Sequence, residues 1–143
     1  MFSKACEYGI RATLFIAQES KNENRTGLKK IAREINSPEA FTAKILQKLV
    51  QENIITSSKG PQGGFFIAPE NQTIVLAEIV KAIDGDSIIN GCALGLDKCS
   101  EDHPCPLHSD FAEIRSGLKH MLENTSIREL TARLDSGLGF LKT

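Results

Sequence analysis

No stretch of this 143-residue sequence approaches the roughly 18 apolar residues of a membrane-spanning helix, so we expect no membrane association. The apolar residues near the N-terminus are interrupted by Glu7, Arg11 and Glu19, which indicates an amphipathic helix and not a signal peptide. Internal repeats and low-complexity segments are also missing. We therefore expect a cytoplasmic globular protein, in which clustered cysteines more often bind metals or undergo redox chemistry than form structural disulfides.

The sequence also lacks the residue arrangements of common catalytic sites. No Ser/His/Asp or Cys/His set suggests nucleophilic catalysis, and the C-terminal half has only scattered acidic residues, interpreted as solvated loop charges: Asp84, Asp86, Asp97 and Asp102. We therefore do not expect an enzyme.

A large excess of charge of either sign is missing as well, since the net charge is −1. The two halves of the chain nevertheless differ. Residues 1–68 contain ten Lys or Arg and six Asp or Glu, whereas residues 69–143 contain seven and twelve. Because neutralisation of phosphates is local, the first half is where we expect contact with DNA.

The first half contains the pattern of a helix-turn-helix. Apolar residues recur at three- and four-residue spacing, which predicts helices over residues 5–18, 28–35 and 39–52. Thr26 and Ser37 are interpreted as the caps of the second and third helices. Two short amphipathic helices joined by a tight turn form a helix-turn-helix or an ordinary helical pair, and the next segment favours the first interpretation.

Two short β-branched or aromatic runs follow, over residues 53–58 and 65–68. Between them lies Lys-Gly-Pro-Gln-Gly-Gly, whose glycines supply the positive-φ residues of a tight hairpin. A hairpin directly after a recognition helix is a wing. The fold class is therefore predicted as mainly α with a small β-hairpin, a winged helix-turn-helix.

The second half predicts three further helices, over residues 74–83, 109–124 and 127–134, with Thr73, Ser109 and Thr125 at their starts. The middle one is long, and its apolar stripe predicts a dimerisation helix: Phe111, Ile114, Leu118, Met121 and Leu122. We expect a DNA-binding domain over 1–85, a cysteine-rich loop over 86–108, and dimerisation and C-terminal helices over 109–143. We call residues 86–108 the cysteine loop.

The cysteine loop holds three of the four cysteines, Cys92, Cys99 and Cys105, and ends at His108. Thiolates and imidazoles bind iron–sulfur clusters and also zinc. Close cysteine pairs of the kind found in zinc sites, with two to four residues between them, are missing, which weakens but does not remove the zinc interpretation. A cluster-free thiol sensor that forms a disulfide is a further alternative. Cys6 is interpreted as a small core residue.

Taken together, these segments resemble the IscR/NsrR/CymR-type family of bacterial winged-helix regulators. The resemblance spans nearly the whole chain and rests on five segments: EYGIRATLFIA, LKKIAREI, AKILQKLVQENIITSSKGPQGGFFIA, VLAEIVKAIDG and the cysteine loop running into CPLH. It implies a symmetric homodimer bound to a double-stranded DNA operator, with the third helix in the major groove. An iron–sulfur or redox carrier with an incidental winged fold is the alternative from another class.

By position in this motif, the resemblance implies DNA contacts from the third helix and the wing: Thr42, Lys44, Gln47, Lys48, Ser57, Ser58, Lys59, Gly60, Gln62 and Gly63. Lys59 stands where relatives often have an arginine, so the charge is kept but the planar fork is lost. Ser37 is interpreted as a helix cap and not as a DNA contact.

The resemblance also implies a cluster that senses redox state, nitric oxide or iron–sulfur status. Ligands would be Cys92, Cys99, Cys105 and His108, with a 2Fe–2S cluster favoured and 4Fe–4S as the alternative. Some relatives use a carboxylate from the partner's first helix, and Glu7 stands at that position. The first cysteine gap is six residues where relatives usually have five, which leaves the cluster type open. His103 is a rival ligand.

Overall fold

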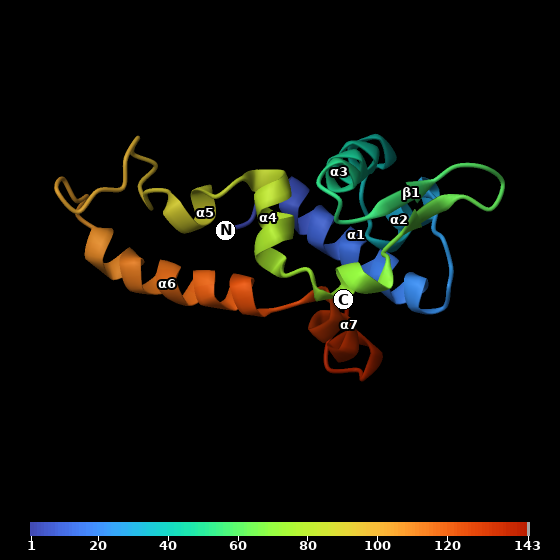
Figure 1. Cartoon of the computed structure of the whole chain (residues 1–143). Helices are drawn as coiled ribbons and strands as arrows, with labels where there is room; N and C mark the ends of the chain where they lie inside the picture. The colour runs from blue at the N-terminus through green and yellow to red at the C-terminus, as the bar shows by residue number, and fades with distance from the viewer. Residues whose placement is uncertain (143) are drawn as a thin grey trace.

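The computed structural model describes residues 1–142 and is mostly helical, with one two-stranded antiparallel sheet (Figure 1). This confirms the predicted fold class. The elements, in chain order, are α1 (Lys4–Lys21), α2 (Leu28–Glu34), α3 (Glu39–Gln51), β1 (Thr56–Ser58), β2 (Gly64–Phe66), the 3-10 helix η1 (Pro69–Thr73), α4 (Leu76–Asp84), α5 (Ser87–Asn90), α6 (His108–Asn124) and α7 (Ile127–Asp135).

Helix α1 lies at the centre of the core and packs against α2, α3, α4 and α7. It begins after Ser3, whose side-chain oxygen accepts a hydrogen bond from the Cys6 amide at 3.0 Å. Its buried face includes Ala12, Ile16 and Ala17, all fully inaccessible to solvent. These small and apolar side chains let the neighbouring helices approach α1 from several sides.

Helix α4 approaches α1 closely at Gly9. A Cβ atom at this position would lie 2.1 Å from the Cδ1 atom of Ile83, which belongs to α4. Only glycine therefore fits the crossing as it stands. This contact joins the helix-turn-helix to the part of the chain that carries the cysteine loop.

The sheet forms the predicted wing, with Thr56 paired to Phe66 and Ser58 paired to Gly64. A third segment extends it, because Thr26 and Phe65 exchange backbone hydrogen bonds of 3.0 and 2.8 Å. Gly64 has φ +145°, and a Cβ there would lie 2.9 Å from the Thr26 backbone. The hairpin is thus held against the segment that leads into α2.

None of the five residues predicted to cap the start of a helix does so, and Ser109 lies inside α6, which begins at His108 after Leu107. Thr26 is buried in its bridge with Phe65, and Gly27 precedes α2 without a side-chain cap. Thr73 ends η1 instead of starting α4, and Val75 occupies the cap position of α4. Before α7 the cap is not a threonine but the next residue, Ser126, which forms a reciprocal pair of hydrogen bonds with Glu129.

The second half of the chain forms an arm that extends from the core. Helices α4 and α5 both pack against α6, and α6 and the cysteine loop reach the end of the molecule opposite the wing (Figure 1). Two backbone hydrogen bonds of 2.9 Å connect the segments at the base of the arm. The Leu76 amide donates to the Thr125 carbonyl, and the Ile127 amide donates to the Ile74 carbonyl. None of the helices within residues 1–142 is long and apolar enough to cross a membrane.

Candidate nucleic-acid interface and cysteine loop

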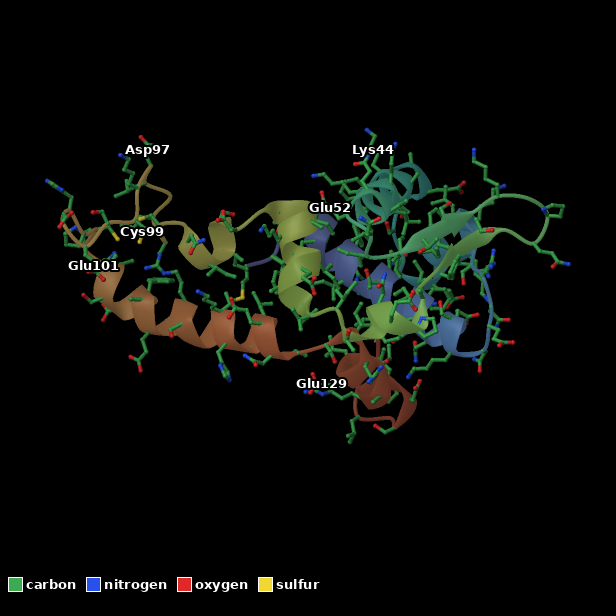
Figure 2. The ribbon with its side chains drawn as sticks, viewed as in Figure 1. Lys44, Glu52, Asp97, Cys99, Glu101 and Glu129 are labelled. Atoms are coloured by element: carbon green, nitrogen blue, oxygen red, sulfur yellow. The ribbon has the colours of Figure 1, made fainter. Side chains whose placement is uncertain are left out.

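The outer face of α3 presents three of the predicted DNA-contacting side chains. Lys44, Gln47 and Lys48 are all exposed, and Figure 2 shows Lys44 pointing away from the body of the protein. The Lys48 ammonium donates to the Ile83 carbonyl at the end of α4, at 3.4 Å. Lys48 therefore also links the recognition helix to α4.

Thr42, in contrast, cannot contact DNA in this structure. It is fully buried, and its hydroxyl donates to the Pro38 carbonyl at 2.8 Å. The hydroxyl of Ser37 bonds that of Thr42, and Pro38 occupies the cap position without a side-chain cap. The expectations that Thr42 faces DNA and that Ser37 caps α3 are therefore corrected, because the two hydroxyls satisfy each other inside the helix-turn-helix.

The tip of the wing is exposed at Lys59, Gly60 and Gln62. Gly60 has φ +101°, and its carbonyl accepts the Gly63 amide at 2.9 Å. A Cβ on Gly63 would lie 2.3 Å from the Ser58 carbonyl oxygen, so this turn closes only with glycine at that position. Small residues therefore leave the backbone of the wing tip open beside the Lys59 charge.

The strand leading to the tip carries the two predicted serines. Ser57 is exposed, whereas Ser58 is half-buried and its hydroxyl accepts a hydrogen bond from Arg25. The Arg25 guanidinium also lies over the Phe66 ring, 4.5 Å from its centroid. Arg25 thus contacts both strands of the wing.

Sequence reasoning missed Arg25, and it also missed Lys29 and Arg33, which line a hollow beside the turn between α2 and α3. All three are exposed. The excess of basic residues in the first 68 positions was the signal that could have found them. Together with Lys44 and Lys59 they make the helix-turn-helix and wing the basic part of the molecule.

The cysteine loop brings its predicted ligands together in two pairs. The Cys99 sulfur lies 3.4 Å from Nδ1 of His108, and Cys105 is one of the neighbours that lower the pKa of the Cys92 thiol. All four residues are half-buried. Within residues 1–142, no three His, Cys, Asp or Glu side chains lie close enough together to hold one metal ion. A single four-ligand site stays a prediction.

Cys92 of the cysteine loop and Cys6 of α1 differ in the direction in which their thiol pKa is shifted. Backbone amides of Leu96 and Leu94 donate to the Cys92 sulfur and lower the pKa of this thiol, which favours the thiolate that binds metals. Burial, reinforced by the negative charge of Asp84, raises the pKa of Cys6 to about 12. Cys6 is fully buried in the core, which agrees with its interpretation as a structural residue.

Arg115 of α6 is a further residue that sequence reasoning missed. Its Nη1 atom donates to the Gly91 carbonyl at 2.6 Å and to the Cys99 sulfur at 2.9 Å. One guanidinium therefore fastens two distant points of the cysteine loop to α6.

The remaining ligand candidates lie apart from these pairs. Glu7 is on the first turn of α1, where it forms an ion pair with Lys4 at 3.2 Å. His103 is exposed in the cysteine loop. The structure describes one chain, so a ligand from a partner's α1 stays a prediction.

Comparison with known proteins decides between the functional classes. A family model described as an iron-dependent transcriptional regulator, Rrf2, matches residues 2–133. The chain belongs to the Rrf2 family. It is a transcriptional regulator and not an enzyme, and its family implies DNA binding.

Individual relatives agree with this assignment. The chain is 24% identical over 123 residues to the HTH-type transcriptional regulator IscR of Photorhabdus laumondii, covering 86% of this chain and 74% of the relative. The structure of CymR, the global cysteine regulator of Bacillus subtilis, superposes with a TM-score of 0.74 at 22% identity over 92% of this chain and 96% of that one. T. potens IscR has the same TM-score at 18% identity, over 98% and 92%. These solved structures confirm the winged-helix fold.

Proposed function

We propose that this Rrf2-family regulator binds a specific operator as a homodimer and that a group held by the cysteine loop controls this binding. The observation that carries the DNA-binding part is the shared exposure of Lys44, Gln47 and Lys48 on α3 beside the glycine-rich wing with Lys59. Helix α3 would enter the major groove while the wing tip lies on the neighbouring backbone. Ser57, Gly60 and Gln62 would contribute contacts at the wing.

The dimer would form through α6. Ile114 and Met121, two turns apart on this helix, are 56% and 41% exposed, although Leu122 on the same helix is fully buried. A symmetric pair of α6 helices would cover these side chains and present two recognition helices to successive half-sites. Replacing Ile114 and Met121 together by Glu should convert a dimer to a monomer in light scattering; an unchanged mass would contradict this interface.

Cys92, Cys99, Cys105 and His108 would hold an iron–sulfur cluster, with 2Fe–2S favoured and Glu7 of the partner subunit as the alternative fourth ligand. The chemistry of the donors fits such a group, because three thiols and an imidazole share one loop and the Cys92 pKa is lowered. When bound, the cluster would supply a redox-sensitive centre. The chain's own contribution is to hold the thiols on one side of α6, where Arg115 fixes Cys99.

Ordering of this loop would couple the cluster to DNA. The loop connects α4, which contacts α3 through Lys48, to α6, which would form the dimer interface. Loss of the cluster through oxidation, nitric oxide or iron shortage would release the loop and shift the population of dimer geometries. The two recognition helices would then match the operator less well.

A cluster-free thiol regulator is the second candidate, because Cys92, Cys99 and Cys105 are free thiols that share one loop. A two-electron oxidant such as hydrogen peroxide would accept the electrons of two of these thiols, and a disulfide would form with release of two protons. Zinc bound to the same residues, and a small iron–sulfur carrier, are the remaining alternatives.

Anaerobic purification followed by absorption spectroscopy and analysis of iron, sulfide and zinc distinguishes these candidates. Bands between roughly 320 and 460 nm with about two irons and two sulfides per chain would support the His108-ligated cluster. Four irons per chain would instead indicate a different fourth ligand. A colourless protein with stoichiometric zinc, or one that stays free of these elements after reconstitution, would refute the cluster sensor.

The DNA-binding part is tested separately with Lys44→Ala and Lys59→Ala. Each should weaken operator binding and reduce the salt dependence of log K by about one per protomer, or about two for the dimer, since each removes about one phosphate contact from each protomer. Arg133→Ala on the exposed side of α7 is the matched control and should leave binding unchanged. Unaltered affinity in the double variant would indicate that α3 and the wing do not form the interface, as expected for a carrier.

A further inference from the structure

A cavity of about 510 Å³ lies at the base of the wing. It is enclosed by the end of α1 and its following loop, by β2 and η1, and by α7. The side chains that determine its chemistry are Lys21, Arg25, Phe66, Ile67, Gln72 and Arg128. We call it the wing-base cavity. Its volume is that of sites for small organic ligands.

The wing-base cavity has an excess of positive charge. Lys21 is neutralised, since its ammonium lies 2.7 Å from the Asp135 carboxylate. Arg25 and Arg128 form no ion pair with any carboxylate of residues 1–142, and Glu23 is the single acidic residue among the lining side chains. Two guanidinium groups without counter-charges favour an anion, and their planar forks suit a carboxylate.

The other residues that line the cavity indicate what the uncharged part of the ligand is like. Phe66 and Ile67 of the segment around β2 present apolar surface, and Pro69 adds to it. The Gln72 side-chain carbonyl oxygen is buried and has no hydrogen-bond partner among the described residues, which is unfavourable unless a donor reaches it. An apolar wall beside two unpaired cations is the arrangement of a site for an organic acid, whereas phosphate or sulfate alone would leave this wall without contact.

We propose that the wing-base cavity binds a small organic carboxylate with an apolar body, whose carboxylate is held by Arg25 and Arg128. Neither the helix-turn-helix pattern nor the cysteine loop accounts for Arg128, because it belongs to α7, which lies below the core in Figure 1, while α3 lies above it. The site is independent of the proposed cluster.

The position of the cavity couples ligand binding to the wing. Arg25 is the residue that donates to Ser58 on β1 and stacks on Phe66 of β2. A carboxylate that engages the Arg25 guanidinium competes with the Ser58 hydroxyl for its N–H groups. A ligand in the cavity therefore changes the contacts that Arg25 makes with both strands of the wing. This consequence for operator binding rests on the proposed function, whereas ligand binding itself does not.

The test uses the full chain without DNA and three carboxylates of increasing apolar size: acetate, 4-methylpentanoate and 4-phenylbutyrate. Binding is followed by the NMR shifts of the backbone amides, including those of Gly60, Gly63 and Gly64 in the wing. We expect saturable shifts at millimolar concentrations and an affinity that rises from acetate to 4-phenylbutyrate. The uncharged 4-phenylbutanamide should bind at least about tenfold more weakly.

Arg128→Ala tests the assignment within the protein. It should lower the affinity for 4-phenylbutyrate at least about tenfold, since it removes a charged hydrogen-bonding group. Arg133→Ala, five residues further along α7 and outside the cavity, should bind the acid like the parent. Arg128 is exposed, so its replacement should not affect folding, which circular dichroism checks.

Several results would overturn the proposal. These are no saturable shift with any of the three acids, equal affinity for the acid and its amide, or unchanged affinity in Arg128→Ala. A loss of affinity for double-stranded DNA in Arg128→Ala without any response to the acids would assign the arginines to a phosphate-contacting surface instead. Because the acids are tested without DNA, failure of the proposed operator binding would leave these results unaffected.

Discussion

The contact between Gly9 and Ile83 allows a quantitative test of how α1 and α4 are joined. In Gly9→Ala, the new Cβ would lie 2.1 Å from Ile83 Cδ1, whereas carbon atoms in contact prefer about 3.5–4.0 Å. Ile83 must leave its rotamer or the helices must separate, which costs about 1–3 kcal/mol. Alanine in a helix offsets about 0.5–1 kcal/mol of this. We expect a net loss of about 1 kcal/mol.

The Ile83→Val background should reverse the sign of this effect. Valine lacks Cδ1, and the next atoms are Ile45 Cγ2 at 3.4 Å and Ile83 Cγ1 at 3.6 Å, which are near ordinary contact. Ile83→Val alone should cost about 0.5–1.5 kcal/mol. Adding Gly9→Ala to it should then recover about 0.5–1 kcal/mol from helix propensity. The coupling between the two positions is therefore expected to be about 2 kcal/mol.

Urea denaturation of the four proteins at one protein concentration measures this coupling. Ile79→Val is the matched control, since it removes the same methyl from α4 at a side chain that Gly9 does not approach. Gly9→Ala should cost the same with and without Ile79→Val, within about 0.5 kcal/mol. Additive free energies for Gly9→Ala and Ile83→Val would refute the close crossing of the two helices.

Two further predictions concern the arm and the core. Arg115→Ala removes the hydrogen bonds to Gly91 and Cys99, each of which contributes about 1.5–3 kcal/mol. Hydrogen exchange of the backbone amides in the cysteine loop of cluster-free protein should therefore accelerate at least about tenfold. Lys119→Ala should leave it unchanged, and equal exchange rates in both variants would show that Arg115 does not order the loop. The second prediction follows from the pKa of Cys6, which folding raises from 9.0 to about 12. Between these two pH values the thiol is ionised in the unfolded chain but protonated in the folded protein. The free energy of unfolding therefore falls as the pH rises through this range. Between pH 8 and pH 10, Cys6→Ala should lose about 1.4 kcal/mol less of its unfolding free energy than the parent, and identical losses would contradict the raised pKa.

The helices could be predicted because their apolar spacing is regular, but their starts could not. Thr26 and Thr125 stand where a capping threonine would be expected. Tertiary contacts assign them elsewhere: Thr26 bridges to Phe65, and the Thr125 hydroxyl donates to the Met121 carbonyl at 2.7 Å. The short helix α5 lies inside the cysteine loop and has too few residues for a periodic pattern.

Most of the residues predicted to contact DNA are exposed on α3 and the wing, where the glycine pattern led us to expect them. Their contact with DNA stays a prediction. Thr42 was assigned to the wrong face, although it is three, four and seven residues before Ile45, Leu46 and Leu49, which are buried. Helical periodicity alone places it inside. The resemblance to the family was given more weight than this spacing, and the structure agrees with the spacing.

No sequence pattern predicts which ligands of the cysteine loop lie next to each other. The wing-base cavity likewise could not be predicted from the sequence. A loop has no period, so nothing in the spacing of Cys92, Cys99, Cys105 and His108 indicates which ones meet. Arg25 and Arg128 are more than one hundred positions apart and line the same cavity because α7 packs against α1. Arg115 contacts Cys99 for a similar reason, since α6 lies alongside the loop.

The most direct test of the central claim compares operator affinity in two states of one preparation. Anaerobically purified protein would be divided, and one half would be depleted of its metal with a chelator and kept reduced. Fluorescence anisotropy would then measure binding of both halves to the same operator fragments at several salt concentrations. We predict a clear difference in affinity, with a similar salt slope, because the cysteine loop changes the spacing of the recognition helices but not the phosphate contacts. Equal affinity of both halves for every operator tried would contradict control of DNA binding through this loop.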